Sequence, residues 1–177
     1  MRITRATRDD LAPLVRLMAA SMLLRRYGVT PASARASLGE ALRRGDPIFV
    51  AVDHDSLVGL AWLITTRALD RSAYLRLLLV ADGARSRGTG TALLARTERA
   101  ARAARCRHLA LLVTRSNRRA RTFYESHGYA HVGDLPGFVR ARITEALYVK
   151  SLSPRASSSL PAAAFDGRPH RPRAVRS

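Results

Sequence analysis

A turn with two glycines lies where an apolar segment runs into a helical one. The stretch from Val80 to Gly90 reads VADGARSRGTG and carries two arginines and two closely spaced glycines, Arg85, Arg87, Gly88 and Gly90. Glycines at the start of a helix let the backbone approach a ligand and leave amide N–H groups pointing outward. Because the helix dipole is positive at this end, it attracts negative charge. The turn therefore predicts an anion-binding site.

The segment around this turn is strongly basic. Residues 85–121 hold eleven arginines and one acid, Glu98. Some of these arginines have a simpler explanation, since at 100° per residue they lie opposite the apolar side of the helix. We expect a solvated helix face from three of them, Arg96, Arg99 and Arg102.

A second candidate segment, SNRRARTFYESHGY, follows about thirty residues later. Asn117 and Tyr124 are seven residues apart, so on a helix they share one face about 10 Å apart along the axis. That spacing suits two contacts along one extended ligand. Because only one of two adjacent aromatic residues can take the inward face, we expect Phe123 in the core and Tyr124 at the ligand.

Alternating and helical patterns predict the elements that position these residues. Helices are expected after Asp9 or Asp10, between Pro31 and Gly45, from Gly88 to about Arg105, and in the segment 116–128. The expected strands are the segments 2–7, 47–53, 57–65, 73–80, 108–114, 129–133 and 145–152, with a hairpin turn at 54–56. This order predicts a mixed α/β fold around one sheet.

The composition changes after Leu152. Residues 153–177 are rich in Ser, Pro, Ala and Arg, with almost no periodic apolar residues. We therefore expect one domain over 1–152, followed by a disordered basic tail over 153–177 that chemistry does not require.

The paired segments resemble those of the GNAT superfamily of N-acetyltransferases. Residues 85–90, RSRGTG, match the R/Q-x-x-G-x-G/A turn of that family, and residues 117–129, NRRARTFYESHGY, match its later N-x-x-A-x-x-F-Y-x-x-x-G-F/Y segment. The opening RITRATRDDLAPLVRLM is similar to the first strand and helix of the family. The resemblance covers about residues 2–152 and implies the GNAT fold, with a splayed central sheet flanked by helices.

The resemblance implies acetyl-CoA as cosubstrate and direct attack of an amine on its thioester. The family splays the strand at 74–80 from the one at 108–113, so that the pantetheine arm bonds the exposed edge. Tyr124 would act at the sulfur, where a phenol can donate a proton to the leaving thiolate. The cosubstrate-binding residues that follow are Leu78, Leu79, Val80, Arg85, Arg87, Gly88, Thr89, Gly90, Thr91 and Asn117.

Two departures from the family pattern concern Asp82 and the general base. Asp82 replaces a frequent proline, and the strand AYLRLLLV lacks the glutamate that serves many members as base. Asp82, Asp53 and His108 are candidates for the base, which stays unassigned. The single cysteine, Cys106, excludes an internal disulfide and a cysteine-based metal cluster, and we expect it to be dispensable.

The net charge of +18 keeps a second class of function open. A basic surface favours nucleic acid, so a nucleic-acid-binding or ribosome-associated protein is the alternative, as is an acetyltransferase of protein N-termini. Against nucleic acid, the arginines lack the interleaved aromatic residues of stacking platforms. No apolar run nears twenty residues and no signal-peptide core follows Met1, so we expect a cytoplasmic protein without a membrane span. A homodimer is compatible with the sequence.

The acceptor site is expected in residues 23–31 and 133–143. These segments carry one acid, Asp134, against several arginines. A small or amino-acid-like amine with a carboxylate is therefore favoured over a polycation such as a histone tail or an aminoglycoside.

Overall fold

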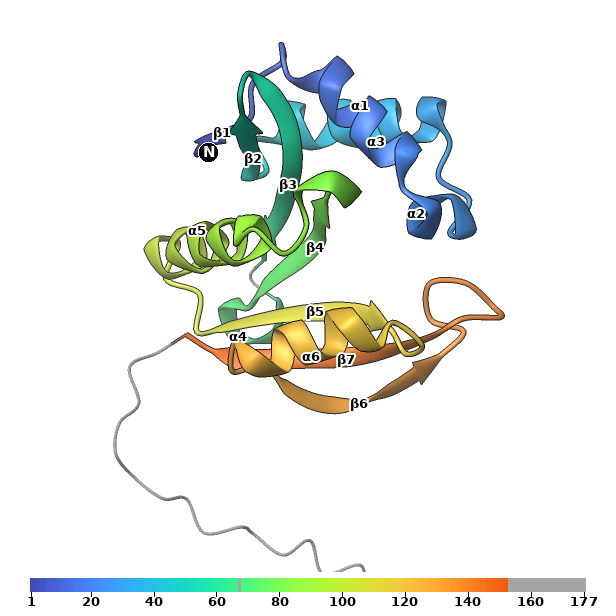
Figure 1. The fold of residues 1–177 in the computed structure, drawn as a ribbon. Coiled ribbons are helices and arrows are strands. Elements are labelled where there is room, and N and C mark those ends of the chain that lie inside the picture. Colours follow the sequence, from blue (N-terminus) through green and yellow to red (C-terminus); the bar gives the residue numbers. More distant parts are fainter. Residues whose placement is uncertain (67, 153–177) are drawn as a thin grey trace, which may run out of the picture.

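A seven-stranded mixed sheet organises the chain (Figure 1). The computed structural model describes residues 1–66 and 68–152. The expectation of a disordered tail over 153–177 falls outside these residues, and the domain boundary at 152 stays a prediction. In the order β1-β2-β3-β4-β5-β7-β6, only the central pair β4 and β5 is parallel. The strands are β1 Arg2–Arg5, β2 Ile48–Asp53, β3 Ser56–Thr65, β4 Ala73–Val80, β5 His108–Thr114, β6 Ala130–Pro136 and β7 Thr144–Ser151.

Four of the helices are the expected ones, within one to four residues at their ends. They are α1 Leu11–Ala20, α3 Pro31–Arg44, α5 Thr89–Ala103 and α6 Arg118–Ser126. Thr30 and Ser33 form a capping box at the start of α3, and Gly45 closes it with φ 76°. The sequence analysis missed two short helices, α2 Met22–Arg26 and α4 Ala68–Arg71, and the 3₁₀ turn Asp82–Ala84. The described helices include none long and apolar enough to cross a membrane.

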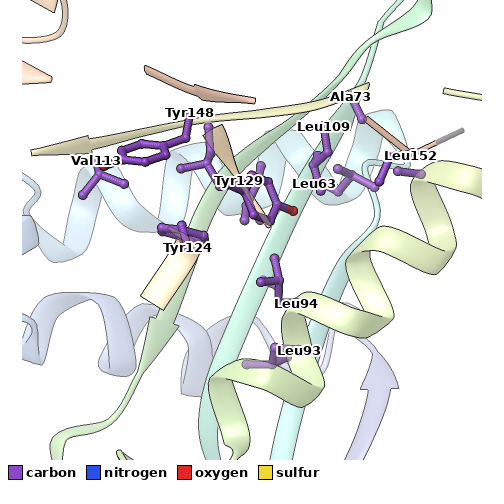
Figure 2. Close-up of a cluster of buried hydrophobic side chains, with 14 of the residues drawn as sticks. Leu63, Ala73, Leu93, Leu94, Leu109, Val113, Tyr124, Tyr129, Tyr148 and Leu152 are labelled. Atoms are coloured by element: carbon purple, nitrogen blue, oxygen red, sulfur yellow. The ribbon is translucent and has the colours of Figure 1, made fainter. Parts of the chain in front are cut away.

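Both faces of the sheet are covered, so the central strands are apolar on both sides. On β2, Ile48 and Val50 pack with α1 and α3, whereas Phe49 and Ala51 belong to the cluster below α5. This second cluster continues through Leu93 and Leu94 of α5 to three tyrosines, Tyr124 on α6, Tyr129 just before β6 and Tyr148 on β7 (Figure 2). The two halves of the sheet thus share one core under α5.

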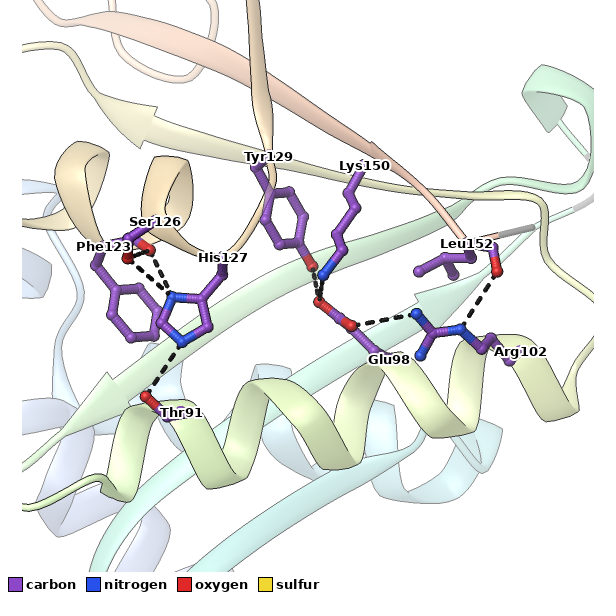
Figure 3. Close-up of polar contacts among 9 residues, drawn as sticks. All are labelled: Thr91, Glu98, Arg102, Phe123, Ser126, His127, Tyr129, Lys150 and Leu152. Atoms are coloured by element: carbon purple, nitrogen blue, oxygen red, sulfur yellow. Dashed lines mark hydrogen bonds and ion pairs between the residues drawn. The ribbon is translucent and has the colours of Figure 1, made fainter. Parts of the chain in front are cut away.

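A buried polar network links α5 to the last strands (Figure 3). Glu98 accepts hydrogen bonds from Tyr129 Oη at 3.2 Å and from Lys150 Nζ at 2.8 Å. Arg102 pairs with Glu98 at 3.4 Å and donates to the carbonyl oxygen of Leu152. Arg102 has the expected solvated position, with a side chain 45% exposed, although its guanidinium also pairs with Glu98. The expectation is wrong for Arg96, which is half-buried and whose guanidinium lies 4.5 Å from the centre of the Phe49 ring.

The parallel pair at the centre of the sheet separates after three residues. β4 and β5 pair only from Ala73 with Leu109 to Leu75 with Leu111. On its other side, β4 skips Arg76 in its pairing with β3, since Leu63 is opposite Leu75 and Trp62 opposite Leu77. Because a β-bulge bends its strand, the bulge at Arg76 accounts for the divergence of β4 from β5 (Figure 1). The expected splay of the sheet is confirmed.

Candidate active site

The gap between the diverging strands is a cavity of about 430 Å³. Its walls come from β4, β5 and the start and middle of α6, and its far end is closed by α2 and the loop before β7. Residues of β4 and β5 in the wall include Arg76, Leu77, Leu78, Leu112, Val113 and Thr114. Where neighbouring strands part, their facing edges lose the N–H and C=O partners that pairing supplies, so these edges suit an extended ligand.

The glycine turn opens α5. Gly88 is the N-cap residue and has φ 78°, a left-handed conformation that glycine adopts without steric cost. A Cβ at Gly90 would lie 3.5 Å from Cζ of Phe123, which places the turn next to α6. The first turn of any α-helix leaves N–H groups without partners inside the helix. The backbone here fits the predicted anion site.

The side chains of the turn divide into exposed and engaged ones. Arg85 pairs with Asp82 at 2.5 Å, and Arg87 is exposed. Arg119 of α6 donates to Oγ of Ser86 at 3.1 Å, which adds a cation that the sequence analysis did not assign to the turn.

The side chains of the two threonines of the turn make hydrogen bonds within the protein. Thr89 is buried and donates to the carbonyl oxygen of Ala84 at 3.3 Å. Thr91 Oγ1 lies 3.2 Å from Nε2 of His127, which ties α5 to α6 (Figure 3). Because both hydroxyls already have partners, the backbone amides of Thr89 and Thr91 are better suited to bind a ligand than their side chains.

The ring of Tyr124 packs in the core, and the residue also lines the cavity. The residue is 7% exposed, and its ring packs edge-on against Phe123 and Tyr129. Among the described residues none bonds its hydroxyl, which leaves that group to the cavity. Phe123 is only half-buried, so the expectation that Phe123 alone takes the inward position is wrong. On this short helix both rings find apolar neighbours, because Phe123 packs toward α5 and Tyr124 toward the sheet.

Burial raises the pKa of the Tyr124 phenol above its ordinary value, and the nearby Tyr74 adds to that shift. The hydroxyl therefore stays protonated at neutral pH. It can donate a proton or a hydrogen bond, but it cannot act as the base.

Asn117 is the N-cap residue of α6 and also lines the cavity. Its Oδ1 accepts the Ala120 N–H at 3.1 Å, an ordinary helix cap. Leu78 lines the cavity too. Leu79 and Val80 do not, because their side chains pack in the two core clusters, which leaves only their backbone to face a ligand.

The three residues considered for the general base lie outside the cavity lining. Asp82 is exposed and pairs with Arg85, and Asp53 pairs with the amino group of Met1 at 3.3 Å. His108 begins β5, at the end where the strands are still paired. Nothing in this geometry favours any of them as base.

The sequence analysis missed a cavity group on β7, Glu145. This glutamate is 1% exposed and lines the cavity. Its Oε1 accepts from the Tyr27 hydroxyl at 3.1 Å, and Tyr27 Oη lies 2.6 Å from Thr114 Oγ1. Glu145 lies at the start of an apolar strand, where an acidic residue is usually exposed to solvent. The sequence therefore gave no sign that this side chain is buried. The carboxylate is buried where Tyr27, the residue after α2, and the N–H of Val139 meet it.

A second, more polar depression adjoins the first. Its volume is about 550 Å³, and Thr114 lines both. Five arginines surround it, drawn from α2, α6, the residue after β5 and the loop before β7: Arg26, Arg115, Arg118, Arg121 and Arg142. We refer to these five residues and Thr114 as the arginine groove.

The diverging central strands and the glycine turn beside them define the protein as an acyltransferase. The family model of the acetyltransferase (GNAT) family matches residues 16–129, well over half of the chain. The chain belongs to the GNAT family. This confirms the expected class, an acetyl-CoA-dependent N-acetyltransferase.

Solved structures similar to this chain share its fold. Aminoglycoside 6'-acetyltransferase type Ii has a TM-score of 0.74 and 24% identity, over 88% of this chain and 99% of that one. An aminoglycoside 6'-N-acetyltransferase complexed with coenzyme A gives 0.72 and 21%, over 88% and 99%. Ribosomal-protein-alanine N-acetyltransferase from Brucella melitensis gives 0.69 and 24%, over 85% and 99%. A comparison with curated protein sequences finds no match.

Proposed function

We propose that the protein transfers an acetyl group from acetyl-CoA to the primary amine of a small, amino-acid-like acceptor. The observation that carries this proposal is the cavity between β4 and β5, with the Tyr124 hydroxyl in its wall. The amine attacks the thioester carbon directly, and the thiolate of coenzyme A leaves. We propose the cytoplasm as the site of this reaction.

In this proposal the cosubstrate runs from the glycine turn into the cavity. The amides of Arg87 to Thr91 receive the pyrophosphate, and Arg85, Arg87 and Arg119 supply charge at the same turn. The pantetheine arm bonds the open edge of β4 at Leu78 to Val80, with Asn117 near its path. The thioester then reaches Tyr124.

Tyr124 is the proposed proton donor to the leaving sulfur. As the C–S bond breaks, negative charge develops on sulfur, and a phenol held beside it stabilises that charge. The raised pKa of Tyr124 supports the role, because the proton is present at neutral pH.

Direct attack, without an acetylated cysteine, is supported by the location of the thiol. Cys106 is 7% exposed, lies outside the cavity lining, and burial raises its pKa. A thiol that is protonated and remote from the proposed thioester position is a poor nucleophile.

The two segments expected to form the acceptor site both reach the cavity. Leu23, Tyr27 and Gly28 line it from one segment, and Val139 and Arg140 from the other. The mixture of apolar walls with arginine supports a small amine that carries a carboxylate.

Calorimetry with purified protein and acetyl-CoA tests the first half of this proposal. A screen of primary amines followed by release of coenzyme A tests the second. We expect binding of acetyl-CoA, and acetylation of amino-acid-like amines ahead of aminoglycosides. Absence of acetyl-CoA binding would contradict the proposal.

Two alternatives keep support from specific observations. The arginine groove and the net charge of +18 favour a nucleic-acid or ribosomal partner. The structural similarity to a ribosomal-protein-alanine acetyltransferase favours a protein N-terminus as acceptor.

A further inference from the structure

Glu145 is a buried carboxylate without a cationic partner among the described residues. The other buried glutamate, Glu98, pairs with both Lys150 and Arg102. Burying an unpaired charge is costly, so such a group is an attractive position for a cation from a ligand. Because Glu145 lines the cavity, a ligand can supply that cation.

The carboxylate is held in place by a chain of hydrogen bonds. Tyr27 donates to Oε1 of Glu145, so the hydroxyl of Thr114 must in turn donate to Tyr27. The N–H of Val139 donates to Oε2 at 3.4 Å. Arg140 fixes this end of α2 by donating to the carbonyl oxygen of Tyr27 at 2.9 Å through Nε.

Gly28 makes room for that clamp. A Cβ at this position would lie 2.7 Å from a guanidinium nitrogen of Arg140, and the residue has φ 75°. Residues from the end of α2 and from the loop before β7 thus hydrogen-bond to both carboxylate oxygens of Glu145 on β7. These contacts fix the position of the Glu145 side chain.

The arginine groove contains positive charges without anionic partners among the described residues. Within the described part of the chain, Arg115 pairs with Asp134 at 2.7 Å and Arg121 donates to Tyr148 at 3.0 Å. Three further arginines come from three elements and have neither an ion pair nor a side-chain hydrogen bond to any described residue: Arg26, Arg118 and Arg142. Converging like charges repel one another, so an anion that enters the groove is stabilised.

We propose that the acceptor is an amine carrying an anionic group, with its ammonium at Glu145 and its anion in the arginine groove. Thr114 lines both depressions, so the two adjoin, and the proposed ligand extends past this residue from the first into the second. This inference rests on the proposed function and assigns its acceptor chemistry. A free amino acid and the N-terminus of an acidic peptide both have this chemistry.

The proton balance follows from these positions. The acceptor arrives as R–NH₃⁺ and gives one proton to the Glu145 carboxylate, which frees the lone pair of the nitrogen. The nitrogen then forms the C–N bond to the acetyl carbon, and the C–S bond breaks. The second proton passes from the nitrogen to solvent as the amide forms. The thiolate receives a proton from Tyr124, and solvent returns one proton to the Tyr124 oxygen. The products are the acetamide, coenzyme A and the proton held by Glu145.

Glu145→Gln tests the ammonium site. The amide keeps an oxygen for the Tyr27 bond but loses the charge. We expect the acceptor kcat/KM to fall about 10² to 10⁴-fold, while the Kd of acetyl-CoA stays unchanged. Glu40→Gln is the matched control, since it makes the same change on α3, at a residue that lines neither the cavity nor the arginine groove. Unchanged acceptor kinetics in Glu145→Gln would overturn the ammonium site.

The double variant Arg118→Gln/Arg142→Gln tests the anion site. The probes are an amino acid, its carboxamide, and a short acidic peptide with a free N-terminus. We expect the unaltered protein to prefer a carboxylate acceptor over its amide at least about tenfold, and the double variant to lose that preference. Arg99→Gln, an exposed change on α5, should keep it. Equal use of acid and amide by the unaltered protein would overturn the anion site.

Activity of the unaltered protein with the same three probes also shows whether the anionic amine is a small molecule or a protein N-terminus. Turnover of the free amino acid identifies a small-molecule acceptor, whereas turnover of the peptide alone identifies a protein N-terminus. Failure of the proposed function is distinguishable, because acetyl-CoA would then not bind, or no amine would release coenzyme A. If acetyl-CoA binds and amines are acetylated, the variants decide the inference by themselves.

Discussion

Loss of the Tyr124 hydroxyl should separate chemistry from acetyl-CoA binding. In Tyr124→Phe the ring still packs against Phe123 and Tyr129, but the proton donor in the cavity is gone. We expect turnover to fall about 10² to 10⁴-fold, with acetyl-CoA affinity nearly intact. Steady-state kinetics and calorimetry on the same preparation measure both quantities.

Tyr129→Phe is a matched control for that variant. It also removes a buried tyrosine hydroxyl, but one that donates to Glu98 outside the cavity lining. A hydrogen bond to a charged group contributes about 1.5 to 3 kcal/mol, so stability should fall while turnover stays unchanged. If Tyr124→Phe retains full activity, Tyr124 is a packing residue.

Cys106 offers a second prediction at the scale of one residue. Its thiol is buried, and burial raises its pKa, so the reactive thiolate is scarce at neutral pH. We expect Cys106→Ala to acetylate acceptors at the normal rate and the native protein to resist alkylation. An acetylated Cys106 in mass spectra of the working enzyme would contradict direct attack.

At the scale of elements, the start of α5 depends on a left-handed residue. Gly88 has φ 78°, and a Cβ there would meet no atom within 4 Å, so the constraint is conformational rather than steric. Gly88→Val should distort the turn and abolish acetyl-CoA binding, because β-branched residues avoid this conformation. Gly88→Asn, which tolerates it, should retain much more affinity. Equal calorimetric Kd values for both variants would argue against the turn as the pyrophosphate site.

At the scale of the whole molecule, Leu152 closes the described fold. Its side chain is 4% exposed, and its N–H donates to the carbonyl oxygen of Arg107 at 2.7 Å. Truncation after Leu152 should therefore leave folding and acetyl-CoA turnover unchanged. Truncation after Lys150 removes this anchor, and full burial of a leucine contributes about 1.5 to 3 kcal/mol, so Tm should drop. Aggregation of the protein truncated after Leu152 would show that residues 153–177 are needed.

The charge of the whole molecule gives a further test of the nucleic-acid alternative. With a net charge of +18, the protein should bind labelled RNA at low salt through counterion release. We expect this binding to vanish near physiological salt. Tight binding that persists there, and that competes with the acceptor, would favour a nucleic-acid partner.

The sequence by itself determined what depends on local spacing. The glycine turn and the helix after it are specified by residues close together in the chain, and both were predicted. The N-cap role of Asn117 was not predicted, because this residue was expected on the helix itself. The order of alternating and helical segments likewise predicted the mixed sheet, because side-chain periodicity reports which face each element buries. The resemblance to the GNAT family rests on these local segments, and the family assignment followed from them.

Tertiary structure alone decided the acceptor end of the cavity. Glu145, Tyr27 and Thr114 are separated by 31 residues at least, and their hydrogen bonds exist only because Tyr27, the residue after α2, meets the paired strands β5 and β7. Likewise, no local pattern showed that Tyr124 is more buried than Phe123, or that Lys150 pairs with Glu98. Burial and pairing of polar groups depend on which segments meet in space, and spacing along the chain does not encode that meeting.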